Sequence, residues 1–72
     1  MNVLVLGSGG REHALCHTIK KSKKLNKLYA IPGNPGIKQI AYCFNINPLD
    51  NNKIKEFAEF YNIDLIIQGS EV

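Results

Sequence analysis

Seventy-two residues, 44% of them hydrophobic and 21% charged, have the composition of one small globular domain. No apolar run approaches the roughly 20 residues of a membrane-spanning helix, so no membrane partner is expected. A net charge of +3 is too small to indicate a nucleic-acid partner. Two cysteines are too few for a disulfide-rich secreted domain, and no signal peptide is visible, so we expect reduced thiols and a cytoplasmic location.

The first predicted element is a strand over residues 2–6. Its residues 3–6 are a continuous apolar run that stops at a glycine, as in strands that are buried on both faces of a parallel sheet. Residues 7–10, Gly-Ser-Gly-Gly, follow as a loop, and residues 11–22 are predicted to form a helix. The apolar face of this helix is predicted to carry Ala14, Leu15, Thr18 and Ile19.

A second strand is predicted over residues 28–31, and it ends in the turn-rich segment 32–36, Pro-Gly-Asn-Pro-Gly. Residues 37–41 are expected to form a turn or a single helical turn. A weak third strand is predicted over residues 43–46.

A second helix is predicted over residues 51–61, with Asp50 or a neighbouring asparagine as its N-cap and with its end at Asn62. Its buried face is expected to carry Ile54, Phe57, Ala58 and Tyr61. A fourth strand follows over residues 63–67. Alternating strands and helices predict an α/β fold, a Rossmann-like parallel sheet of about four strands in the order 3-2-1-4 with flanking helices.

The clearest functional signal is the glycine-rich loop over residues 7–10. Glycines allow a sharp turn and the close approach of a ligand, and the N–H groups at a helix start attract an anion, most often phosphate. The alternative is a tight turn that binds nothing. The dinucleotide fingerprint is incomplete, because Glu12 stands where its third glycine belongs and no acidic residue follows the second strand. A single phosphate on a smaller molecule therefore fits better than NAD or FAD.

Ligands of α/β sheets bind beyond the carboxyl ends of the strands, so the loops that follow the first, second and fourth strands are expected to form one concave site. Arg11 is either a partner for phosphate oxygens or a solvated residue of the first helical turn. Glu12 either stabilises the helix start alone or also accepts hydrogen bonds from an amine or hydroxyl of a sugar. Glu71 is either an acceptor for vicinal ribose hydroxyls or a surface acid.

His13 and His17 lie four residues apart, a spacing that can bind a metal on one helix face. No third ligand has a suitable spacing, so one packed and one solvated histidine is the favoured interpretation and no metal is expected. Cys16 and Cys43 are interpreted as small buried hydrophobic residues. The lysines of residues 20–27 lack interleaved aromatic residues, which indicates a solvated surface.

Three segments taken together resemble the N-terminal domain of the phosphoribosylamine–glycine ligases, also called glycinamide ribonucleotide synthetases. They are residues 3–15 (VLVLGSGGREHAL), 32–36 (PGNPG) and 64–71 (DLIIQGSE). The resemblance covers essentially the whole chain, and its GGREHAL part is highly specific. It implies the pre-ATP-grasp N-domain of an ATP-grasp ligase, which joins glycine to 5-phosphoribosylamine through a glycyl phosphate in de novo purine (IMP) biosynthesis. It also implies that the full-length enzyme uses ATP, cleaved to ADP and phosphate, and Mg²⁺ or Mn²⁺.

The resemblance places one group of residues around phosphoribosylamine, or around the product glycinamide ribonucleotide. Gly9, Gly10 and Arg11 would lie near the 5-phosphate, Glu12 and Glu71 near the amine or ribose hydroxyls, and Asn34 and Gly36 along the same cleft. Two positions depart from the family pattern. Ser70 replaces the usual proline before Glu71, which could loosen that loop, and Ser8 stands where glycine is common.

The ATP-grasp and C-terminal domains of that family have no counterpart in residues 1–72. We therefore expect a truncated N-terminal substrate-binding domain that binds no cofactor itself and is inactive alone. Whether a partner chain binds is left open by the residues. Two alternatives remain, a nicotinamide- or nucleotide-binding Rossmann domain of an oxidoreductase and a remnant without a ligand.

Overall fold

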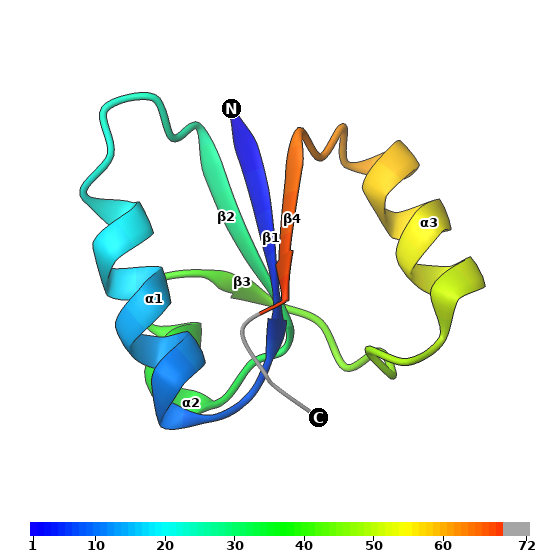
Figure 1. Cartoon of the computed structure of the whole chain (residues 1–72), viewed down its shortest axis with the longest axis horizontal. Coiled ribbons are helices and arrows are strands. Elements are labelled where there is room, and N and C mark those ends of the chain that lie inside the picture. Colours follow the sequence, from blue (N-terminus) through cyan, green and yellow to red (C-terminus); the bar gives the residue numbers. More distant parts are fainter. Residues whose placement is uncertain (69–72) are drawn as a thin grey trace.

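The computed structural model describes residues 1–68, which form one four-stranded sheet in the order β3-β2-β1-β4 (Figure 1). All three strand pairs are parallel. The elements in chain order are β1 (Asn2–Gly7), α1 (Gly10–Lys20), β2 (Lys27–Pro32), α2 (Pro35–Lys38), β3 (Tyr42–Cys43), α3 (Asn51–Phe60) and β4 (Leu65–Gln68). The predicted fold class and strand order are confirmed.

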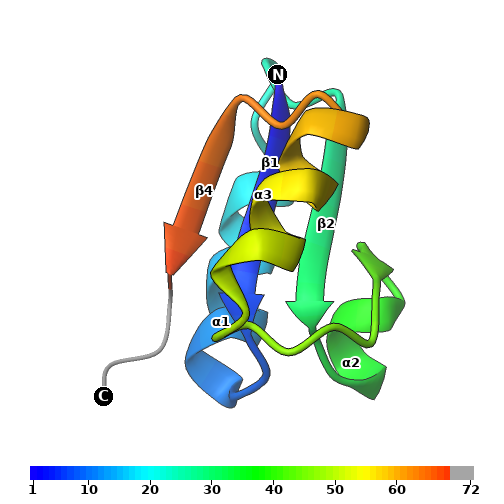
Figure 2. The same cartoon turned by 90° about the vertical axis from the view of Figure 1, so that its right-hand side faces the viewer.

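Helices cover the two faces of the sheet unequally. Helices α1 and α2 lie on one face, and α3 lies on the other (Figures 1 and 2). This arrangement follows from right-handed crossovers, because the chain moves outward from β1 through β2 to β3 and then returns past β1 to β4. None of the helices within residues 1–68 combines the length and the apolar character that crossing a bilayer requires.

Two hydrophobic cores lie on opposite faces of β1 and β2. Alternate residues along each strand point to opposite faces, so a strand buried on both faces is apolar throughout. The core under α1 and α2 consists of Val3, Val5, Cys16, Leu28, Ala30 and Ile37. The core under α3 consists of Leu4, Leu6, Tyr29, Ile31, Ile54 and Phe57. Full burial of a valine, leucine, isoleucine or phenylalanine side chain stabilises a fold by about 1.5–3 kcal/mol.

The face of α1 that packs on the sheet differs from the predicted one. Leu15 and Ile19 are partly buried against the core as expected, but Ala14 and Thr18 are exposed. The buried residues of α1 are Glu12 and Cys16. The prediction was wrong because it excluded a charged residue from the packed face, whereas the Glu12 carboxylate has a hydrogen-bond partner inside the fold.

Helix α3 begins and packs as predicted. The Asp50 carboxylate caps it by accepting a hydrogen bond from the Lys53 N–H at 3.2 Å, and Ile54 and Phe57 are buried. The chain leaves the helix at Asn62, whose φ of 54° is left-handed and suits asparagine.

The last two strands are shorter than predicted. Strand β3 stops at Cys43, because the Ile46 N–H donates to the Phe44 carbonyl and turns the chain toward the α3 core. Strand β4 starts at Leu65, because Asp64 anchors the chain to the start of β1. Its carboxylate accepts from the Asn2 N–H at 2.6 Å, and its own N–H donates to the Asn2 carbonyl at 2.8 Å.

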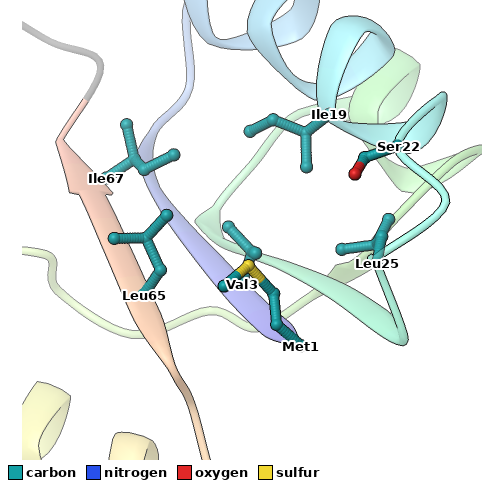
Figure 3. A pocket seen from close by; sticks show the side chains of 7 residues that line it. All are labelled: Met1, Val3, Ile19, Ser22, Leu25, Leu65 and Ile67. Carbon is teal, nitrogen blue, oxygen red and sulfur yellow. The ribbon is translucent and has the colours of Figure 1, made fainter.

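Strand β4 is the least covered part of the described sheet. Leu65 and Ile66 point to opposite faces and are each 44% exposed. On the α1 side, a groove of about 180 Å³ separates β4 from the end of α1 (Figure 3). It is lined by Met1, Val3, Ile19, Ser22, Leu25, Leu65 and Ile67.

Candidate functional site

A hollow of about 420 Å³ lies at the carboxyl ends of the strands. Its walls come from the ends of β1, β2 and β4 and from the segment that leads into α3. The lining residues are Leu6, Gly7, Ser8, Gly9, Glu12, Pro32, Pro48, Leu49 and Gln68. The first loop and the end of β2 thus meet at one site, and Gln68 brings the end of β4 to it. Ligands of α/β sheets bind at this position.

The first loop depends on the absence of a side chain at Gly7. Gly7 has a φ of 138°, and a Cβ atom there would lie 2.5 Å from the Glu12 Cγ. A larger residue would therefore be strained and would also push Glu12 out of place. This close approach lets β1 turn directly into α1.

The buried side chain of Glu12 stabilises the first loop through a hydrogen bond. Its side chain is 3% exposed, and its Oε1 accepts a hydrogen bond from the Gly9 N–H at 2.6 Å. This is half of a capping box, in which an acid in the first helical turn reaches back to the N-cap residue. The carboxylate therefore has a partner within the protein, and the side chain also forms part of the wall of the hollow.

The start of α1 offers backbone N–H groups to an anion. The N-cap residue, Gly9, has no side chain that could cap them, and the His13 N–H donates along the helix axis to the Gly9 carbonyl at 3.1 Å. The amides of the first turn precede that bond and point toward the loop. The partial positive charge of the helix N-terminus adds to their attraction for an anion.

Arg11 and Gly10 lie in this first turn, next to the hollow but not among its lining residues. Both are exposed. A Cβ atom at Gly10 would meet no atom of residues 1–68 within 4 Å, so these residues leave open space on this side of the turn.

Two hydrogen bonds link the loop after β2 to the loop after β1. The Asn34 Nδ2 donates to the Ser8 carbonyl at 2.8 Å, while its Oδ1 accepts from the Ile37 N–H at 2.8 Å and caps α2. The Gly33 N–H donates to the Gly7 carbonyl at 3.1 Å. Asn34 does not line the hollow; it holds the two loops at a fixed separation.

Gly36 does not line the hollow either. It lies under the imidazole of His13, where a Cβ atom would come 2.6 Å from the ring Cε1. The glycine therefore serves the close packing of α1 on α2. Glu71, the remaining predicted site residue, lies outside the described residues.

Two residues of the hollow were missed by the sequence interpretation, Pro48 and Leu49. They precede α3, and a helix that connects two parallel strands must begin near the carboxyl edge of the sheet. That rule could have placed them at the site. Leu49 is 73% exposed, so its apolar side chain forms an open rim.

The cysteines lie away from this hollow. Burial raises the pKa of the Cys16 thiol, and the nearby Cys43 and Glu12 raise it further. Burial also raises the pKa of Cys43, partly offset by its hydrogen bond with the Asn34 backbone and by Lys38. A raised pKa leaves less thiolate at neutral pH, so neither is an activated nucleophile.

The chain is similar over its whole length to known purine-biosynthetic ligases. The family model described as "Phosphoribosylglycinamide synthetase, N domain" matches residues 1–72. The phosphoribosylamine–glycine ligase of Caldanaerobacter subterraneus subsp. tengcongensis is 49% identical over 72 residues, which are 100% of this chain and 17% of that protein. The ligase of the same name from Mesorhizobium japonicum is 49% identical over 71 residues, 99% of this chain and 17% of that protein.

A longer protein also contains the matched region. The trifunctional purine biosynthetic protein adenosine-3 of Drosophila pseudoobscura pseudoobscura is 39% identical over 75 residues, which cover 97% of this chain and 6% of that protein. The chain therefore spans less than one fifth of the length of each of these relatives.

Proposed function

The chain belongs to the family of phosphoribosylglycinamide synthetase N domains, and we propose that it is the part of a phosphoribosylamine–glycine ligase that holds 5-phosphoribosylamine. The observation that carries this proposal is the hollow at the carboxyl ends of the strands, which adjoins the first turn of α1. Its volume of about 420 Å³ is within the usual range of small-molecule sites.

The 5-phosphate would bind at the first-turn amides of α1. Gly9 and Gly10 leave the backbone accessible, and Arg11 carries a positive charge next to it. A guanidinium pairs with phosphate oxygens through two parallel hydrogen bonds, which fixes orientation as well as affinity. Glu12 fills the space beside Gly7, which supports one phosphate over the pyrophosphate of a dinucleotide.

The ribose and its amine would extend across the hollow. Glu12, and Glu71 beyond the described residues, are the acids that we propose for the amine or ribose hydroxyls. Because the Glu12 Oε1 already accepts the Gly9 N–H, only its remaining acceptor capacity is offered to the substrate. Asn34 and Gly36 would act indirectly, by fixing the second loop against the first.

The ligation itself would need other parts of the enzyme. No three His, Cys, Asp or Glu side chains come together within residues 1–68, so these residues do not fit a Mg²⁺ or Mn²⁺ site. We propose that ATP, its metal ion and glycine bind elsewhere in the ligase. The chain alone would then bind phosphoribosylamine or glycinamide ribonucleotide without catalysis, in the cytoplasm.

Substitution at Gly10 tests the phosphate site. The Gly10→Asp variant places a negative charge in the first turn, where an acid is compatible with the helix dipole, so the fold is expected to persist. Gly10→Ala is the matched control, because both side chains enter open space. The measurement is the dissociation constant of glycinamide ribonucleotide, from backbone amide chemical shifts in the NMR spectrum.

We expect shifts at residues 7–12 in the parent chain, an affinity within about threefold of it in Gly10→Ala, and a loss of at least about tenfold in Gly10→Asp, equivalent to 1.4 kcal/mol. Equal affinities in all three proteins would contradict the phosphate site.

A parallel titration with NAD tests the oxidoreductase alternative. Shifts with neither compound would support a remnant without a ligand.

A further inference from the structure

His13 and His17 form a pair on α1 that the proposed substrate site does not use. They lie one helical turn apart, with ring centroids separated by 4.8 Å and ring planes at 36°. Their Nε2 atoms are hydrogen-bonded to each other at 3.1 Å. One nitrogen therefore donates a proton to the lone pair of the other, and an ion that replaced this proton would contact both.

The separation of these nitrogens suits a bound transition metal. Bonds from a metal ion to imidazole nitrogen are about 2.0–2.1 Å long. Two nitrogens 3.1 Å apart would then subtend an angle of about 95–102° at the ion. This lies between the right angle of square-planar or octahedral complexes and the tetrahedral angle, so the two nitrogens can keep their separation while the rings turn to face the ion.

Packing already fixes one of the two rings. The His13 imidazole rests on Gly36 of α2, where a Cβ atom would lie 2.6 Å from its Cε1 and 3.0 Å from its Nδ1. His13 is partly buried, whereas His17 is exposed, so an ion can reach the pair from solvent. A ring that is held before binding loses less conformational entropy when the ion arrives.

We propose that His13 and His17 form a surface site for a divalent transition-metal ion of the kind that prefers imidazole, Cu²⁺, Ni²⁺ or Zn²⁺. Mg²⁺ and Ca²⁺ are not candidates, because they prefer oxygen ligands. No third His, Cys, Asp or Glu joins the pair within residues 1–68, so among the described residues the two imidazoles would be the ligands of the ion. Affinity should follow the order Cu²⁺ above Ni²⁺.

A titration of the whole 72-residue chain with Ni²⁺ tests this site. Ni²⁺ is paramagnetic, so it broadens the amide signals of the residues that surround it, and its location can be read from the NMR spectrum. His17→Gln removes one ligand at an exposed position. Thr18→Gln is the matched control, since it is the exposed neighbour on the same helix and leaves both imidazoles in place.

We expect broadening centred on residues 13–17 in the parent chain and in Thr18→Gln, at similar Ni²⁺ concentrations. Removal of outer-shell partners alone weakens metal sites by about 10–100-fold, so loss of a direct ligand in His17→Gln should weaken binding at least tenfold. Equal affinity in His17→Gln, or broadening centred on Met1 or Cys43, would overturn the proposal. Neither variant alters a residue that lines the substrate hollow, so this result is independent of glycinamide ribonucleotide binding.

Discussion

The Glu12 carboxylate lies 2.6 Å from the backbone nitrogen of Gly9 and is almost completely buried beneath the loop that it stabilises. In dinucleotide-binding domains this position is a glycine, which allows the helix to pack closely on the strand. Here an acid occupies the space between helix and loop and holds the loop through a hydrogen bond. The same residue thus orders the backbone at which we propose that the phosphate binds.

Replacing Glu12 should destabilise the fold. We expect Glu12→Ala to lower the free energy of unfolding by about 1.5–3 kcal/mol, because it removes a hydrogen bond to a charged group and leaves the Gly9 N–H without its partner. Glu12→Gln keeps an oxygen acceptor of the same shape and should lose less than half as much. Urea denaturation measures both. If Glu12 served the substrate alone, both variants would be as stable as the parent chain.

Asn34 should stabilise the fold through both its amide nitrogen and its amide oxygen. Asn34→Ala removes the α2 cap and the link to Ser8, and we expect it to cost about 1–2 kcal/mol of stability. Asn34→Asp keeps the capping oxygen but loses the donor to the Ser8 carbonyl. Hydrogen exchange of the Ile37 amide should stay slow in Asn34→Asp and become fast in Asn34→Ala. Equal exchange in the two variants would show that the cap does not depend on this oxygen.

Alanine substitutions at Gly36 and Gly10 compare a crowded glycine position with an open one. A methyl group at Gly36 meets the His13 ring, so Gly36→Ala should cost about 1–3 kcal/mol of stability. A methyl group at Gly10 meets nothing, and alanine is the better helix former, so Gly10→Ala should range from neutral to about 1 kcal/mol more stable. Thermal unfolding followed by circular dichroism compares them. A stable Gly36→Ala variant would mean that the His13 ring can turn aside from α2 without cost.

Burial of Cys16 should make stability depend on pH in the alkaline range. Burial raises the pKa of this thiol above its ordinary value of 9.0, so the unfolded chain releases the proton at a lower pH than the folded chain does. The associated stability is fully present below pH 9 and is lost as the pH rises through the higher, folded-state pKa. The raised pKa of Cys43 acts in the same direction.

The Cys16→Ala variant isolates this effect, since every other titrating group remains. We expect the free energy of unfolding of the parent chain to fall more steeply between pH 8.5 and pH 10 than that of Cys16→Ala. Identical slopes would show that the thiol titrates alike in both states. Labelling with a thiol reagent at pH 8 should also modify the partly exposed Cys43 well before Cys16.

The sheet was predictable because its signals are local and strong. Residues 3–6 are apolar at every position, as in strands that are buried on both faces, and the alternation with helices then determines the strand order. The N-cap of α3 at Asp50 and the end of this helix at Asn62 could also be predicted from the sequence. Each depends on one residue type at one backbone position.

The site was harder to predict because its residues act through tertiary contacts. Asn34 and Gly36 were predicted to line the cleft, but Asn34 bonds to Ser8 and Gly36 packs under His13, both distant in sequence. The buried face of α1 was misassigned for the same reason. A charged residue such as Glu12 is predicted to be exposed unless its partner, the Gly9 N–H, is known in advance.

Strand β4 is the part of the described sheet through which this chain is expected to self-associate at high concentration. It is a sheet edge in the described residues, and Leu65 and Ile66 present apolar surface on either side of a row of backbone groups. No lysine, proline or bulge interrupts its four residues, Leu-Ile-Ile-Gln, so it lacks the usual protection against joining another strand. Self-association of the 72-residue chain should therefore begin at this edge, and a lysine in place of Ile66 should slow it.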